Sequence, residues 1–300
     1  MVFKKMLQKF GVGGPSVDTV LSESRCHPGG LLSGEVRLTG GEADADIEHI
    51  ALSLVVRGGR AGSLTEFHRV VVSGATRLEA KQQRTIPFTM PVPWETPVTE
   101  VTGQALPGIE VGLRTELAIA KAVDKGDLDP VIVAPAPAHD AVLDAFGQLG
   151  FGFKSVELEA GRVHGLRQEL PFYQEIAFYP SGPYAGRLSE VELVVVAERD
   201  GVQVVLEADR RGGDVQARFA VGHEEALDTE WARLIGDWLD RVAAQHGHHG
   251  YGHHDEYGHH DGYGQRRGPG MGAVVAGAAA GVVGGMVLGE VLDDAFEDDE

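Results

Sequence analysis

The residues with the most evident capacity for chemistry are the histidines of a tract between positions 246 and 264. Neutral imidazole binds zinc, nickel or copper, and Asp255 and Asp261 would add oxygen ligands beside it. Because the tract presets no ligand geometry, unlike a structural zinc site, we expect loose binding of mixed stoichiometry. The candidate ligands of this weak metal site are His248, His249, His253, His254, His259 and His260.

Two other interpretations of the histidine tract stay open. Imidazoles gain charge below about pH 6.5, so the tract would respond to pH by offsetting a repulsive acidic surface. Alternatively, the repeated Tyr-Gly-His-His-Asp unit is a hydrated low-complexity linker. Its Gly content and adjacent charges make independent folding unfavourable.

Elsewhere the sequence holds no recognisable catalytic set. Cys26, the only cysteine, precedes His27 in a strand-like run, so the two side chains would point to opposite faces rather than form a thiolate pair. No nucleophile elbow, phosphate loop, dinucleotide fingerprint or zinc-protease motif occurs. The sequence therefore predicts a protein that is not an enzyme and needs no cofactor.

A row of glycines near the C-terminus has spacing suited to contact. Residues 268–289 carry no charge and include Gly277, Gly281, Gly285 and Gly289 at four-residue intervals. On a helix this row would form a smooth groove for close approach of another helix, in a membrane or in a protein oligomer. The cost of glycine in a helix, about 1 kcal/mol each relative to alanine, leaves a third interpretation, a largely disordered segment.

Composition limits the classes of partner. The formal net charge of −19 gives no basic excess, which argues against nucleic-acid binding, since phosphate contacts need clustered Lys and Arg. A single cysteine and an N-terminus without a signal-like apolar region predict a cytoplasmic location. Residues 2–10 have an amphipathic helical pattern, either docked on the domain that follows or lying on a membrane.

The first half of the chain alternates with a period of two. Ile50, Leu52, Leu54 and Val56 alternate with Ala51, Ser53, Val55 and Arg57, which predicts one buried and one solvated strand face. Runs of this kind without intervening helices predict an antiparallel β-sandwich. The prolines near residue 130 mark the predicted boundary of this domain.

A second β region, a helix over 139–149 and a hairpin turning at Asp200-Gly201 are predicted beyond that boundary. Residues 227–244 form the clearest amphipathic helix, with Asp228 as its N-cap. Its Trp231 and Trp238 would anchor a partner or pack on the second sheet. The predicted segments are a sandwich over 1–130, a second sandwich with terminal helix over 131–245, a linker over 246–267, the apolar run 268–289 and an acidic tail over 290–300.

Several segments together resemble the bacterial sporulation-control family with an arrestin-like fold, over about residues 1–240. They include Phe3-Lys4-Lys5, Val17-Asp18-Thr19-Val20-Leu21, Pro28-Gly29-Gly30, Pro91-Val92-Pro93-Trp94-Glu95-Thr96-Pro97 and Gln168-Glu169-Leu170-Pro171-Phe172-Tyr173-Gln174-Glu175. Prolines beside Trp94 exclude a central strand, so Trp94 would cap a core or anchor a partner from an edge or loop.

The resemblance implies an all-β protein of two tandem arrestin-like sandwiches without catalytic residues. It implies a cytoplasmic regulator of sporulation or development that contacts other proteins, such as regulators of cell division or sporulation. We expect the tail to localise or cluster it. Two alternatives stay open, a metal- or pH-responsive sensor built on the histidine tract and a membrane-anchored structural protein.

Overall fold

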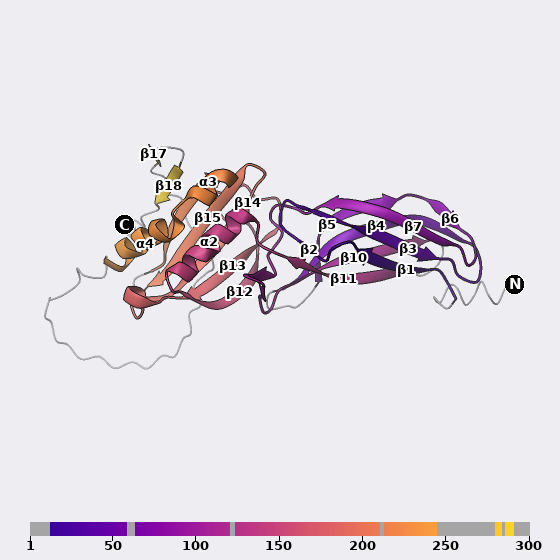
Figure 1. The fold of residues 1–300 in the computed structure, drawn as a ribbon, viewed down its shortest axis with the longest axis horizontal. Coiled ribbons are helices and arrows are strands. Elements are labelled where there is room, and N and C mark those ends of the chain that lie inside the picture. The colour runs from indigo at the N-terminus through magenta and orange to yellow at the C-terminus, as the bar shows by residue number, and fades with distance from the viewer. Residues whose placement is uncertain are drawn as a thin grey trace, which may run out of the picture. The chain divides into compact units, whose positions relative to one another are not determined.

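The computed structural model describes residues 13–58, 64–120, 124–210, 213–244, 280–283 and 286–290. These residues fall into two compact units. The first runs to Ala136 and includes Val156–Leu158, and the second contains the remainder from Pro137. Most of the described secondary structure is β-strand, with few helices, which confirms the predicted all-β class (Figure 1).

The first unit contains two main sheets, with strand pairs that are nearly all antiparallel. One has the order β1-β3-β7 and comprises β1 (Ser16–Leu21), β3 (Leu31–Thr39) and β7 (Gln83–Pro91). The larger sheet has the order β2-β11-β10-β4-β5 and comprises β2 (Arg25–Cys26), β11 (Lys125–Val133), β10 (Glu110–Ile119), β4 (Ala45–Arg57) and β5 (Leu64–Ser73), with β6 (Thr76–Leu78) pairing β4. A short ribbon joins β8 (Glu100–Val101) to β9 (Gln104–Ala105).

The alternating residues of β3 and β4 supply much of this unit's core, because side chains two apart share one strand face. Leu32, Val36 and Leu38 from β3 are almost completely buried. A polar link joins β1 to the larger sheet, where the hydroxyl groups of Thr19 and Thr115 lie 2.7 Å apart in the interior.

The prediction of a solvated second face on β4 is wrong. Ala51, Ser53 and Val55 are as buried as the core residues between them. β4 lies between β10 and β5, and Arg69 of β5 reaches across it, where its Nη1 donates to Ser53 Oγ at 3.4 Å. Alternation alone does not reveal such covering from adjacent strands.

The second unit has one sheet in the order β12-β13-β14-β15-β16-β18-β17. Its strands are β12 (Gly152–Ala160), β13 (Phe172–Tyr179), β14 (Leu188–Ala197), β15 (Gly201–Arg210), β16 (Val215–Gly222), β17 (Ala280–Val283) and β18 (Met286–Glu290). Its helices are α2 (Pro137–Gln148), α3 (His223–Asp228), α4 (Trp231–Ala244) and the 3-10 turn η1 (Gly182–Tyr184).

Helices α2, α3 and α4 lie on the same face of this sheet, where a sandwich would have its second sheet (Figure 1). Phe146 of α2 stacks on Phe178 of β13 with ring centroids 4.2 Å apart, and Trp231 of α4 meets Phe219 of β16 edge-on at 6.1 Å. Aromatic pairs of this kind add to the free energy gained by burial. The second unit is thus a helix-covered sheet.

The domain boundary lies after Ala136, six residues beyond the predicted one. Pro130 belongs to β11 and pairs with Gly112. β2 pairs only with Ile132 and Val133 of β11, so at Pro130 the strand has a neighbour on one side only. A proline's missing N–H is tolerated at such an edge.

The predicted hairpin is present, but its turn lies one residue earlier than expected. Ala197 pairs with Val202, and the backbone N–H of Glu198 donates to Gly201 O at 2.8 Å, so Arg199 and Asp200 are the central residues. Gly201 serves another purpose: a Cβ there would lie 2.1 Å from the carbonyl oxygen of Val221 in β16. Close approach of two strands, rather than positive φ, explains this glycine.

The predicted helix over 227–244 is divided in two. α3 ends at Asp228, Thr229 has extended backbone angles of −73° and 127°, and α4 begins at Trp231. Asp228 is therefore the last residue of one helix rather than the N-cap of another. The break lets the indole nitrogen of Trp231 donate to Ala226 O at 2.8 Å.

Candidate functional site

The predicted metal ligands of the histidine tract lie outside the described residues. Within the residues that the structure does describe, no group of three or more His, Cys, Asp and Glu side chains is arranged to hold a metal ion. The helical pattern over residues 2–10 also lies outside the described part of the chain.

Cys26 lies on β2 and is buried, which raises the pKa of its thiol to about 11. The thiolate is the reactive form of cysteine, so desolvation keeps this group protonated and unreactive at neutral pH.

The glycine row is partly described, and its described residues lie in strands rather than in the helix on which a contact groove would form. Gly281 lies in β17 and Gly289 in β18, while Gly277 and Gly285 lie outside the described residues. β18 pairs with β16 through Ala217 and Arg218. The strands include Val282, Val283 and Val287, and β-branched residues favour strands whereas glycine disfavours a helix. In the described residues, no helix is long and apolar enough to cross a bilayer.

Two of the three tryptophans predicted to anchor a partner, Trp231 and Trp238, are buried in the second unit. Trp231 and Trp238 are 2% and 1% exposed, so α4 packs on the second unit and neither indole is available at the surface. Trp94 lies in a turn after β7, as expected from its prolines, and is half-buried. Its ring packs on Gly29, and Gly29 N–H donates to Val92 O at 3.1 Å. The fold thus brings together two of the segments that carry the family resemblance.

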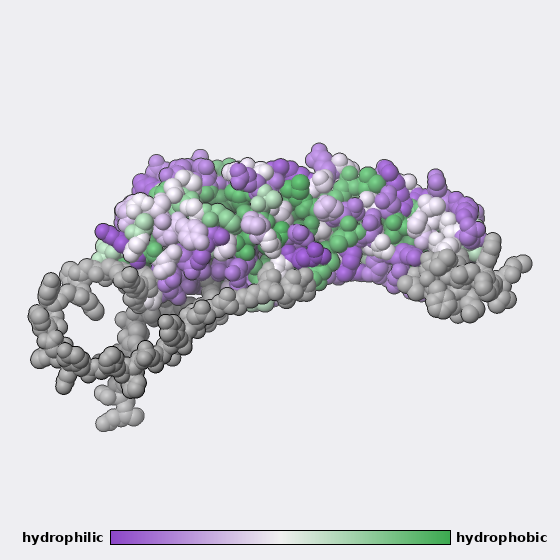
Figure 2. Space-filling view, turned by 90° about the horizontal axis from the view of Figure 1, so that it is seen from below, coloured by the Kyte–Doolittle hydropathy of each residue, from purple (hydrophilic) through white to green (hydrophobic). Residues whose placement is uncertain are grey.

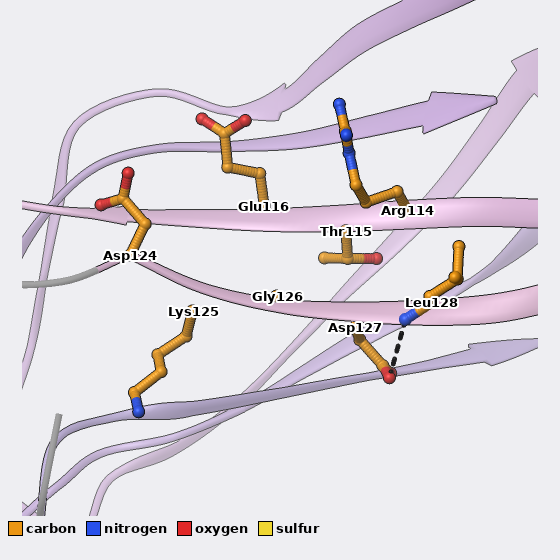
Figure 3. Close-up of a pocket in the computed structure, with 8 residues that line it drawn as sticks. All are labelled: Arg114, Thr115, Glu116, Asp124, Lys125, Gly126, Asp127 and Leu128. Carbon is orange, nitrogen blue, oxygen red and sulfur yellow. Dashed lines mark hydrogen bonds between the residues drawn. The ribbon is translucent and has the colours of Figure 1, made fainter. Parts of the chain in front are cut away.

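A shallow depression over β10 and β11 is lined by five charged residues together with Thr115, Gly126 and Leu128 (Figure 3). Arg114 and Glu116 point to one side of the sheet, whereas Lys125 and Asp127 point to the other, so these groups do not converge. Both oxygens of Asp127 accept backbone N–H groups, from Thr19 at 2.9 Å and from Leu128 at 3.0 Å. The carboxylate therefore holds strands together rather than facing a ligand.

The outer face of the larger sheet carries a network of ion pairs. Glu116 accepts hydrogen bonds from Arg69 and His49, each at 2.9 Å, and Arg114 pairs with Glu66. Arg69 lowers the pKa of Glu116 below its usual range.

On the face shown in Figure 2, hydrophilic and hydrophobic residues of the described chain are interspersed.

The edge strands of the first unit's sheets differ in the features that hinder pairing with a further strand. β7 carries Pro87 and Pro91, and β2 has only two residues. β1 uses the backbone N–H of Thr19 to bind Asp127 Oδ2. β5, by contrast, has ten residues, no proline, and one neighbouring strand in its path, β4. Its Leu64 and Val71 are 39% and 58% exposed.

A buried carboxylate cluster lies on the face of the second sheet opposite the helices. Glu192 of β14 lies directly across from Glu207 of β15, and Glu175 of β13 belongs to the same group. Glu207 and Glu175 are 7% and 9% exposed. Sequence reasoning missed this cluster. The hairpin could have revealed it, since a turn centred on Arg199 and Asp200 sets Glu192 opposite Glu207.

Comparisons with known proteins identify the family. The family model described as "Spo0M: SpoOM protein" matches residues 3–212. The sporulation-control protein spo0M of Bacillus subtilis (strain 168) is 32% identical over 262 residues, which cover 80% of this chain and 98% of that protein. The crystal structure of Spo0M from Bacillus subtilis matches with a TM-score of 0.67 and 28% identity, covering 77% of this chain and 100% of the other. This chain belongs to the Spo0M family of sporulation-control proteins.

Proposed function

We propose that this chain is a non-enzymatic, cytoplasmic regulator in sporulation or development that acts through protein contacts of its β-rich units. Membership of the Spo0M family supports the role in sporulation control. The single observation that supports the contact mechanism is the long, proline-free edge strand β5, whose charged residues Glu66 and Arg69 are already paired with residues of β10. The partner we infer is a protein that contributes an extended segment as an additional strand.

The argument rests on the contrast between β5 and the other edges of the first unit. An edge strand exposes backbone N–H and C=O groups that bind another strand unless proline, charge or short length prevents it. β7 and β2 have such protection through proline and short length, and the Thr19 amide of β1 is already bound. The exposed side chains of Leu64 and Val71 beside the β5 edge would contact apolar residues at alternate positions of the partner.

A charge placed at this edge tests the proposal. Val71→Lys puts a solvated ammonium group where the added strand would pack, which is a way that natural edge strands avoid pairing. In host cells lacking the chromosomal gene, we expect this variant to fail to restore normal sporulation or development while its melting temperature stays close to wild type. Thr85→Lys on the exposed face of β7 is the matched control. Equal complementation by both variants would overturn the proposal.

A photo-crosslinking residue gives a direct second readout. Placed at Val71 in the full chain, it should give a discrete adduct in developing cells, whereas the same residue at Thr85 should not. Adducts of equal yield at both positions would indicate non-specific proximity rather than docking at β5.

We further propose that the tail localises the protein in the cell or clusters it. Fractionation of cells expressing the full chain and a version ending at Gly264 tests this part separately. If only the full chain enters a salt-resistant membrane pellet, residues beyond Gly264 anchor it. If neither enters the pellet, size measurement of both proteins decides whether those residues drive self-association.

A further inference from the structure

The second unit contains two carboxylates in an unusual mutual position. Glu192 and Glu207 are register partners on adjacent antiparallel strands, so they share one sheet face at close range. Glu207 is almost completely buried, and Glu192 is partly buried. Two like charges directly opposite one another, with little water between them, destabilise a strand pair.

Hydrogen bonding distinguishes the two members of the pair. Gln216 of β16 donates its side-chain amide to Glu207 Oε2 at 2.6 Å, an interaction that favours the ionised form of Glu207. A hydrogen bond with Asp214 acts in the opposite direction and raises the pKa of Glu207, so the proton is assigned to the pair. Burial raises the pKa of Glu192 to about 8, with further contributions from the charges of Glu175 and Glu207.

The charged groups around the pair are mostly acidic. Burial raises the pKa of Glu207 as well, as do Asp214 and Asp209. Lys154 lowers the pKa of Glu192, but its ammonium group is already paired with Glu190. Other titratable or charged groups on the surrounding strands are Glu157 and Glu159 on β12, Tyr173, Glu175 and Tyr179 on β13, and Arg218 on β16. The loop of residues 161–171, which packs on the same face, adds Arg162, His164, Arg167 and Glu169.

A loop covers the same face beside the pair. This strap, residues 161–171, is closed at its base by a hydrogen bond from Gly161 N–H to Pro171 O at 2.8 Å. Inside it, the Gln168 amide oxygen accepts the N–H of Val163 at 3.0 Å, and its nitrogen donates to the carbonyl oxygens of Leu170 and Phe172.

The strap packs on residues next to the carboxylates. Val163 and Leu166 belong to a cluster with Tyr173, Val194, Val196 and Val205. Val194 is two residues from Glu192, and Val205 is two residues from Glu207, so each pair shares one side of its strand. Any separation of β14 from β15 at the glutamates therefore disturbs the surface that holds the strap.

We propose that Glu192 and Glu207 form a proton-operated switch, in which one proton on the pair keeps the strap closed over the sheet and loss of that proton loosens it. The ligand of the site is the proton, and the moving element is the strap.

The direction of the effect follows from linkage. The pKa of Glu192 lies above the value of 4.5 for an unperturbed glutamate, so the folded state binds its proton more tightly than the unfolded chain does. The stability contributed by this proton is fully present below pH 4.5 and is lost as pH rises through about 8. Opening of the strap is favoured on the alkaline side.

Hydrogen exchange of the full chain, expressed as protection factors that remove the intrinsic effect of pH, tests the switch. If opening of the strap returns the pKa of Glu192 to the value of an unperturbed glutamate, protection of the strap amides should fall about tenfold between about pH 7 and pH 9. Glu192→Gln should abolish this dependence. Glu224→Gln removes an exposed carboxylate from α3 on the helix-covered side and should behave as wild type.

Two further measurements make the result decisive. Glu207→Gln removes the opposing charge and should move the midpoint of strap opening to lower pH. Carbon-13 NMR of the wild-type side chains should show Glu192 titrating near pH 8. Titration near pH 4.5, a strap whose protection does not change with pH, or an unchanged dependence in Glu192→Gln would each overturn the proposal.

Discussion

The indole ring of Trp94 lies directly against Gly29: a Cβ atom at position 29 would lie 2.4 Å from ring carbons of the tryptophan. Gly29 also has a φ of +75°, a backbone angle that residues other than glycine rarely adopt. The turn before β3 and the turn after β7 are joined at this point by hydrogen bonds between Gly29 and Val92 and between Val92 and Gly30.

Gly29→Ala should therefore destabilise the first unit through two effects. The left-handed backbone costs about 1 to 2 kcal/mol with a Cβ present, and the overlap with Trp94 costs about 1 to 3 kcal/mol. Urea unfolding measures the sum. Gly74→Ala is the control, because a Cβ there meets no atom within 4 Å and its φ is not positive. Equal free energies of unfolding for both variants would contradict the packing seen here.

The buried hydrogen bond between Thr19 and Thr115 predicts non-additive substitutions. Thr115→Val leaves the Thr19 hydroxyl in the interior without this partner, at a cost of about 1 to 3 kcal/mol. The double variant Thr19→Val/Thr115→Val removes both polar groups, so its loss should be smaller than the sum of the single losses. A double-mutant cycle by chemical denaturation measures the difference. Strict additivity would mean that the two hydroxyls do not interact.

Trp238→Ala should behave as a core truncation. Trp238 is 1% exposed, and removing a large buried aromatic side chain costs about 3 to 5 kcal/mol. Calorimetry should show a large fall in the melting temperature of the second unit. Leu227→Ala on α3, where Leu227 is 56% exposed, should change it little. A Trp238→Ala variant that kept its melting temperature and lost only biological activity would restore the partner-anchor hypothesis.

His139 predicts acid sensitivity of the second unit. Burial lowers the pKa of its imidazole from 6.5 to about 4, with a further contribution from the charge of His223. The folded state therefore favours neutral His139. Below pH 6.5 the unfolded chain binds a proton that the folded state excludes, so stability falls as pH drops toward 4, by roughly 3 kcal/mol for a shift of this size.

Denaturation curves measured between pH 7 and about pH 4 check this expectation. His139→Gln should flatten the part of the acid slope that belongs to the second unit, while the same change at exposed His164 should leave it intact. If both variants keep the wild-type slope, His139 does not control acid stability.

Local sequence patterns predicted the strands and helices whose formation depends on residues close together in the sequence. The strands β14, β15 and β16, the hairpin between the first two and the helix α2 all match expectation closely. Long-range contacts were beyond such patterns. Whether Val55 faces water depends on the strands beside β4, and the purpose of Gly201 depends on Val221 in the next strand.

The sequence by itself determined the β-rich class, the family and the glycine-rich character of residues 246–289, because periodicity, composition and motif residues are properties of the chain alone. Only the tertiary structure decided that Trp231 and Trp238 are buried, that β5 is an edge strand, and that Glu192 meets Glu207. Burial, strand order and register arise from contacts between distant segments, and these contacts set the desolvation and charge that give a side chain its role.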